Sequence, residues 1–342
     1  MNASAVRWPP LILAAASLLL AFAQPGSQPP ASGVPDVTFR AESSLALVRF
    51  QVVAAKNDFV TDLRADEIEL REDGIPQKIA SFQGGRLNPR TSPIDIHLLF
   101  DCSGSIQKAR LLNPYVFSAN LLDEFQNVRI GIWGFSGRTL VYFTAPTRDA
   151  NRLNGAMEAV RGMPEGSSPI YRSLVEVAGR LSKAAGDSLR MVVVVSDGLP
   201  YLDAGKKDDA VRAAERAGIE LFPALMNAQL SNLDTLPHNH PEFTGDWDVL
   251  AAEDAARQMR AQKSTFISLA ESTGGRAFEF AGRTPEDLLD QILKKMAAEI
   301  RYDYTAGYSP SSTGNGKPRR VQVVLKDKNR GQIVGGVRYV QR

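Results

Sequence analysis

The sequence predicts an α/β fold in which a doubly wound, mostly parallel sheet is inserted between β-rich flanks that form a small β-sandwich. Between residues 94 and 301, short apolar runs alternate with stretches of helical periodicity. Two of these runs, Ile96–Phe100 and Met191–Val195, are almost unbroken, which is typical of strands covered on both faces. On either side of this region, apolar and polar residues alternate with the two-residue period of half-buried strands.

Length and composition narrow the class of protein. The chain has 342 residues, a net charge of +2 and one cysteine, and 44% of its residues are hydrophobic. About two domains are expected from this length, and the composition excludes a largely disordered chain. One cysteine excludes an intramolecular disulfide framework and a Cys-rich zinc site. The nearly neutral charge argues against a nucleic acid partner.

The first residues have the pattern of an export signal. Arg7 precedes the apolar run Leu11–Ala23, which is shorter than the roughly 20 residues that a membrane-spanning helix needs. Ala21-Phe22-Ala23 is an A-x-A cleavage site, so we expect residues 1–23 to be a signal peptide removed before Gln24. The mature protein is then secreted or periplasmic, with no membrane span. An uncleaved N-terminal anchor is the alternative.

The remaining chain divides by its patterns. Residues 24–36 are rich in Pro, Gly and Ser and are expected to form a linker. Residues 37–90 contain three or four strands, residues 91–302 form the α/β domain, and residues 303–342 return to strands, the last expected from Ile333 to Val340. Since two or three strands are marginally stable alone, we expect 303–342 to pair with 37–90.

Oxygen-bearing side chains follow two of the central strands. Asp101-Cys102-Ser103-Gly104-Ser105 comes directly after Ile96–Phe100, and Asp197-Gly198 follows the strand Met191–Val195. In open α/β sheets, sites lie beyond the carboxyl ends of the strands. Together with Ser168, these residues place three groups of oxygens at one sheet edge and favour a metal ion. Each also has a structural explanation: a strand end, a turn, or, for Ser168 before Pro169, a helix N-cap.

The donor types predict which ion. Carboxylates and hydroxyls are hard oxygen ligands, and neither sulfur nor imidazole accompanies them. Such ligands suit Mg²⁺, or Mn²⁺ or Ca²⁺, better than zinc or copper.

These residues resemble a von Willebrand factor A domain with a metal-ion-dependent adhesion site, whose motif is D-x-S-x-S…T…D. Asp101, Ser103 and Ser105 match its first loop, and Asp197 matches the carboxylate after the fourth strand. Ser168 stands where the family has Thr, which keeps the hydroxyl but loses the β-branch that fixes the rotamer. The resemblance implies that these five residues hold a divalent ion with one position open for a partner's carboxylate.

The flanks resemble those of one branch of this family. Asp66–Gln77, which contains E-D-G-I-P-Q, and Tyr304–Pro310 are similar to segments that flank the domain in exported bacterial proteins first defined in acidobacteria. This resemblance implies the architecture of almost the whole mature chain and adds little about function.

We therefore expect an exported protein-binding or adhesion module that captures an Asp or Glu side chain of a partner protein through a divalent ion. The alternative is a structural or assembly scaffold of the cell envelope without a working metal site. A metal-assisted hydrolase is less favoured, because no general base lies near the ion ligands in the sequence, so we expect no enzyme activity.

Three further features stay open. Cys102 is either a spacer in the metal loop or a reactive thiol. His238 and His240 have a spacing that could chelate zinc, although a polar surface loop is the favoured explanation. The connection from Asn227 to Gly245, with Trp247 just beyond, is too long for an ordinary link and is expected to contact the partner.

Overall fold

The computed structural model describes residues 45–342 except 55–57, 88–92, 109–116, 118–121, 123–126, 184–187, 202, 204, 227–245, 281–284, 311–318, 336 and 341–342. The expected signal peptide, residues 1–23, and the linker, residues 24–36, lie outside the described residues. Among the helices of the described part, none is long and apolar enough to cross a membrane.

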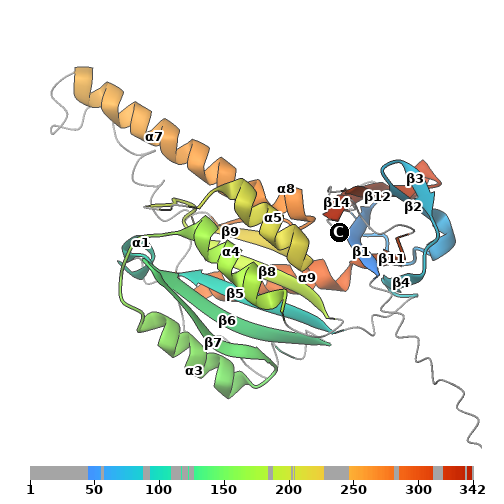
Figure 1. Ribbon diagram of the computed structural model, residues 1–342, viewed down its shortest axis with the longest axis horizontal. Coiled ribbons are helices and arrows are strands. Elements are labelled where there is room, and N and C mark those ends of the chain that lie inside the picture. Colours follow the sequence, from blue (N-terminus) through green and yellow to red (C-terminus); the bar gives the residue numbers. More distant parts are fainter. Residues whose placement is uncertain are drawn as a thin grey trace, which may run out of the picture. The chain divides into compact units, whose positions relative to one another are not determined.

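A six-stranded sheet forms the centre of the α/β region (Figure 1). Its strand order is β10-β9-β8-β5-β6-β7, and all neighbours are parallel except β7, which runs antiparallel to β6. The strands are β5 (Ile94–Asp101), β6 (Val128–Ser136), β7 (Thr139–Thr147), β8 (Leu189–Ser196), β9 (Ile219–Met226) and β10 (Phe278–Phe280). This confirms the predicted α/β fold class with a mostly parallel sheet.

Helices cover both faces of this sheet. Side chains alternate between the faces along each strand, so the apolar strands present apolar surface on both faces, and helices pack against each. Leu153 of α3 and Ile292 of α9 belong to the apolar core on one face, whereas Leu174 of α4 and Ala210 of α5 belong to the core on the other. The helices are α1 (Gly104–Lys108), α3 (Ala150–Arg161), α4 (Ile170–Leu181), α5 (Lys207–Ala217), α7 (Asp246–Ile267), α8 (Leu269–Thr273) and α9 (Pro285–Arg301).

The flanking strands form two antiparallel sheets, of order β13-β1-β11-β4 and β14-β12-β2-β3. Each sheet mixes strands from both flanks, and a shared apolar core that includes Phe50, Leu70, Tyr304 and Val323 lies between them. The strands are β1 (Ala46–Val53), β2 (Ile68–Glu72), β3 (Ile75–Gln77), β4 (Ser81–Gly84), β11 (Tyr304–Tyr308), β12 (Arg319–Leu325), β13 (Gln332–Gly335) and β14 (Val337–Val340).

The last expected strand differs from the prediction. Instead of one strand from Ile333 to Val340, β13 pairs with β1 in the first sheet and β14 pairs with β12 in the second. Gly335 ends β13 with a φ of +74°, a left-handed conformation that glycine adopts at little cost. The chain therefore changes sheets at this point, which alternation alone does not predict.

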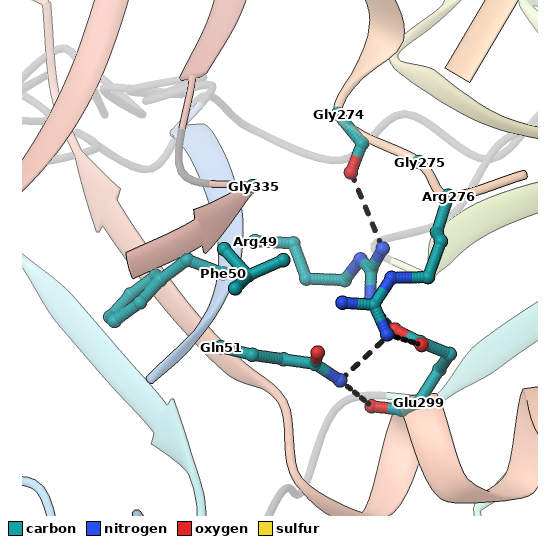
Figure 2. Close-up of a pocket in the computed structure, with 9 residues that line it drawn as sticks. Arg49, Phe50, Gln51, Gly274, Gly275, Arg276, Glu299 and Gly335 are labelled. Carbon is teal, nitrogen blue, oxygen red and sulfur yellow. Dashed lines mark hydrogen bonds and ion pairs between the residues drawn. The ribbon is translucent and has the colours of Figure 1, made fainter. Parts of the chain in front are cut away.

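A buried ionic cluster joins the sandwich to the α/β region. Arg49 of β1 donates to Glu220 of β9 and, over 2.6 Å, to Asp303, and all three side chains are nearly inaccessible. Arg276 pairs with Glu299 of α9 at 2.5 Å. Figure 2 shows Arg49, Arg276 and Glu299 among the residues that line a small pocket, with Arg49 reaching the Gly274 carbonyl. We call Arg49, Glu220, Arg276, Glu299 and Asp303 the joint cluster.

Candidate functional site

Asp101 is the centre of the polar site at the carboxyl ends of the strands. It is the last residue of β5, a strand with every residue buried, and its own exposed fraction is 0%. Its Oδ2 accepts hydrogen bonds from Ser168 Oγ at 2.5 Å and from Ser196 Oγ at 2.7 Å, and its Oδ1 accepts one from the Ser103 amide at 2.9 Å. Burial raises the pKa of the Asp101 carboxyl to about 6, although the serine hydroxyls oppose that rise.

Asp197 is the second carboxylate of the site and follows β8 directly. Only 2% of its surface is exposed. Ser105 Oγ donates to Asp197 Oδ2 at 2.7 Å, and Ser105 Oγ lies 3.2 Å from Ser103 Oγ. Asp197 Oδ1 accepts from the Leu199 amide at 3.1 Å, which fixes the chain beyond the strand.

The structure thus brings the predicted residues into one network, with Ser196 as an additional member. We call this set the edge cluster: Asp101, Ser103, Ser105, Ser168, Ser196 and Asp197. The prediction missed Ser196. The parallel register between β5 and β8, in which Val195 pairs with Phe100, places Ser196 beside Asp101.

Ser168 does not cap the helix that follows it. The N-cap position of α4 is Pro169, and no side chain at that position makes a capping hydrogen bond. Instead, Asp203 accepts from the Tyr171 amide at 2.6 Å and occupies the free end of the helix from a distant loop. The Ser168 hydroxyl is therefore available to Asp101, while the Ser168 backbone pairs with Tyr201 through two hydrogen bonds of 3.2 Å.

The edge cluster contains two buried carboxylates and no positively charged side chain that would balance their charge. Within the described residues, neither Asp101 nor Asp197 forms an ion pair with Lys, Arg or His. A buried charge is costly unless it is paired or coordinates a metal. The donors, two carboxylates and four hydroxyls, match the hard ligands that Mg²⁺, Mn²⁺ and Ca²⁺ take. In the described part of the chain, no three His, Cys, Asp or Glu side chains gather to hold a metal by themselves, so hydroxyl ligands would be required.

Cys102 lies beside this cluster and faces the core. It is fully buried, and its Sγ lies 3.7 Å from the Phe100 carbonyl oxygen. Burial raises the pKa of the Cys102 thiol to about 12, so the thiol stays protonated. These observations favour a spacer over a reactive thiol.

The other open candidates lie outside the described residues. The connection Asn227–Gly245 lies outside the described residues, together with His238 and His240. The side chain of Trp247 and its surroundings are not described either. Their expected roles stay predictions.

Comparison with known proteins finds a family similarity within the α/β region. Residues 95–241 match the family model of the von Willebrand factor type A domain. No curated protein matches the chain. The domain identification rests on the family match, because the similar solved structures have TM-scores below 0.5.

Three solved structures illustrate the likeness. BatB from Bacteroides thetaiotaomicron is 14% identical with a TM-score of 0.37, covering 60% of this chain and 97% of that one. The pilus adhesin SpaC from Lactobacillus rhamnosus GG, in its open conformation, is 12% identical with a TM-score of 0.41, covering 82% and 48%. A von Willebrand factor type A protein from Catenulispora acidiphila is 10% identical with a TM-score of 0.40, covering 86% and 72%.

Proposed function

We propose that the von Willebrand factor type A domain of this chain is an exported interaction module that binds a divalent ion, Mg²⁺ or else Mn²⁺ or Ca²⁺. Through that ion it captures an Asp or Glu side chain of a partner protein. The ion ligands are Asp101, Ser103, Ser105, Ser168 and Asp197, so the site is a metal-ion-dependent adhesion site. Export rests on the signal pattern of residues 1–23.

One observation carries the proposal: two neighbouring carboxylates are buried, and no positively charged side chain of the described residues pairs with them. Asp101 and Asp197 have exposed fractions of 0% and 2%, and only hydroxyl and amide groups of the described residues bond to them. A divalent ion would supply the missing charge. The hydroxyls that now donate to the carboxylates can turn their lone pairs toward the ion, because a hydroxyl is both donor and acceptor.

The chain's own groups determine how the ion would be presented. Asp101 is held by three hydrogen bonds and Asp197 by two, so both carboxylates are pre-oriented. Ser105 is half-buried whereas the carboxylates are not exposed, so the site is open on the side of residues 103–105, which we call the serine loop. When bound, the ion supplies a Lewis-acidic position for an incoming carboxylate. Because only two of the proposed ligands carry a negative charge, the ion would stay electrophilic enough for that role.

The first test is the cation dependence of the melting temperature. A ligand at about 100 times its Kd stabilises the native state by about 2.7 kcal/mol, which is a rise of roughly 5–10 °C for a domain of this size. We expect Mg²⁺ to raise the melting temperature of the wild type. Asp101→Ala should abolish the rise, and Ser168→Ala should reduce it less, since a neutral hydroxyl contributes less than a charge.

The control is Asp209→Ala, which removes an exposed carboxylate on α5 that pairs with Arg212 on the same helix. It should keep the full rise, and Ser168→Thr should keep or increase it by fixing the rotamer. An equal rise in wild type and Asp101→Ala would place the ion elsewhere.

The second test addresses the partner. A pull-down from the source envelope with Mg²⁺ should retain a partner that EDTA and Asp101→Ala release. A structural scaffold predicts the same capture under all three conditions. The hydrolase alternative is tested by an activity screen with and without metal, in which a metal-dependent turnover would replace the binding proposal.

A further inference from the structure

Glu165 places a further carboxylate beside the edge cluster, in the loop that leads to Ser168. A methyl group at Gly104 would lie 3.1 Å from Glu165 Oε2, so this carboxylate lies directly against the loop between Ser103 and Ser105. Gly104 has no side chain, and this absence is what gives the carboxylate its space. Glu165 is exposed, and among the described residues its carboxylate has no hydrogen bond or ion pair.

The backbone around Glu165 is held in place. A side chain at Gly166 would meet Ser136 Oγ at 2.7 Å and the Gly137 amide nitrogen at 3.0 Å, so this glycine packs tightly against the end of β6. The Gly137 amide donates to the Ser167 carbonyl at 2.8 Å. Glu165 is therefore positioned by two close contacts: its neighbour Gly166 packs against the end of β6, and its own carboxylate lies against Gly104.

We propose that Glu165 is an outer carboxylate of the cation site, which rests on the proposed function. It attracts the ion from the exposed side and adds negative charge, without belonging to the inner ring of ligands. This agrees with the geometry, since no three carboxylates of the described residues gather at one point. An exposed charge beside a divalent ion acts through the Coulomb energy, which falls when salt screens it.

The experiment is Mn²⁺ binding measured by isothermal titration calorimetry on the mature chain, for wild type, Glu165→Gln and Glu165→Lys. At about 0.01 M salt, where screening reaches about 30 Å, we expect Glu165→Gln to weaken Mn²⁺ binding about three- to tenfold. Glu165→Lys should weaken it further, because it reverses the charge. At about 1 M salt, where screening reaches about 3 Å, the variants should lie within about twofold of wild type.

Two controls keep this interpretation separate from others. Glu271→Gln removes an exposed carboxylate on α8 and should bind Mn²⁺ as wild type does. Asp101→Ala should abolish binding at both salt concentrations. Because Glu165 is exposed, melting temperatures in EDTA should be the same for wild type and both Glu165 variants.

Each contrary result has a distinct meaning. Equal Mn²⁺ affinity in wild type and both Glu165 variants would overturn the role of Glu165 while Asp101→Ala still supports the cation site. A loss as large as that of Asp101→Ala, and independent of salt, would make Glu165 an inner ligand and overturn its outer role. Unchanged binding in Asp101→Ala would overturn the cation site itself.

Discussion

The two edges of the central sheet bury carboxylates in opposite ways. At the amino edge, where β9 begins, Glu220 and Asp303 of the joint cluster surround Arg49. Burial by itself would lower the pKa of the Arg49 guanidinium, but the Asp303 and Glu220 carboxylates outweigh burial and hold that pKa above its ordinary value. At the carboxyl edge, Asp101 and Asp197 meet only hydroxyl and amide groups of described residues.

The difference separates carboxylates that are paired with arginine from the carboxylates that we propose bind a cation. A buried cluster in which arginines pair with carboxylates fixes two parts of a fold together. An unpaired buried carboxylate costs stability, and a protein that retains it gains when a cation binds. Arg49→Met and Asp101→Asn test whether the two edges differ in this way, with Arg64→Met as a control and His97→Gln as a test of a buried group that carries no charge.

The largest effect is expected at the joint cluster. Arg49→Met keeps the approximate volume of the side chain but leaves the Glu220 and Asp303 carboxylates buried without their cation. Breaking a buried pair in this way costs about 3–5 kcal/mol of unfolding free energy. Urea denaturation would measure the loss.

The matched control for that variant is Arg64→Met. Arg64 also pairs with an aspartate, Asp66, at 3.1 Å, but both side chains are about two-thirds exposed, at 69% and 66%. Exposed pairs contribute little, so this variant should unfold almost as wild type does. A loss at Arg49 no larger than at Arg64 would remove the distinction between the two edges.

His97 sharpens the comparison, because it is a buried group that stays uncharged. It lies in β5, 2% exposed, and its Nδ1 accepts a hydrogen bond of 3.1 Å from Trp133 Nε1. Burial lowers the pKa of His97 from 6.5 to about 4. Between these values the unfolded chain binds a proton that the folded chain excludes, so stability falls as pH decreases from about 6.5 to about 4.

The His97 share of that loss is about 2–3 kcal/mol. His97→Gln keeps an acceptor for Trp133 and cannot titrate. We expect the stability difference between wild type and this variant to change by about 2–3 kcal/mol between pH 7 and pH 4, measured by urea denaturation at several pH values. A difference that stays constant with pH would mean that folding does not lower the pKa of His97.

The smallest effect is expected at Asp101 in the absence of metal. Asp101→Asn removes a buried charge that has no cation, and the hydroxyls of Ser168 and Ser196 can rotate to accept from the new amide. We expect the free energy of unfolding in EDTA to change by less than about 1 kcal/mol, in contrast to Arg49→Met. With Mg²⁺ present, the wild type should become the more stable of the two. A loss of 3 kcal/mol or more in EDTA would make Asp101 a structural acid like Glu220.

The pattern of strands was predictable because it depends on local sequence. The apolar runs of β5 and β8 need cover on both faces, and parallel strands place the residues that follow them at one edge. Asp101 and Asp197 are brought together for this reason. Ser196 and Asp203 were not predicted, since the first depends on the register between β5 and β8 and the second contacts a helix more than thirty residues away in the sequence.

By itself the sequence predicted the fold class, most of the order of elements and the five candidate ion ligands, because periodicity and strand ends are properties of neighbouring residues. Tertiary structure alone decided that Arg49 meets Glu220 and Asp303, over 171 and 254 residues of chain. It also decided that the chain changes sheets after Gly335, and that Glu165 lies against Gly104. The physical reason is that each of these contacts joins segments distant in the sequence, and for the buried groups the cost of burial depends on the partner that such a segment supplies.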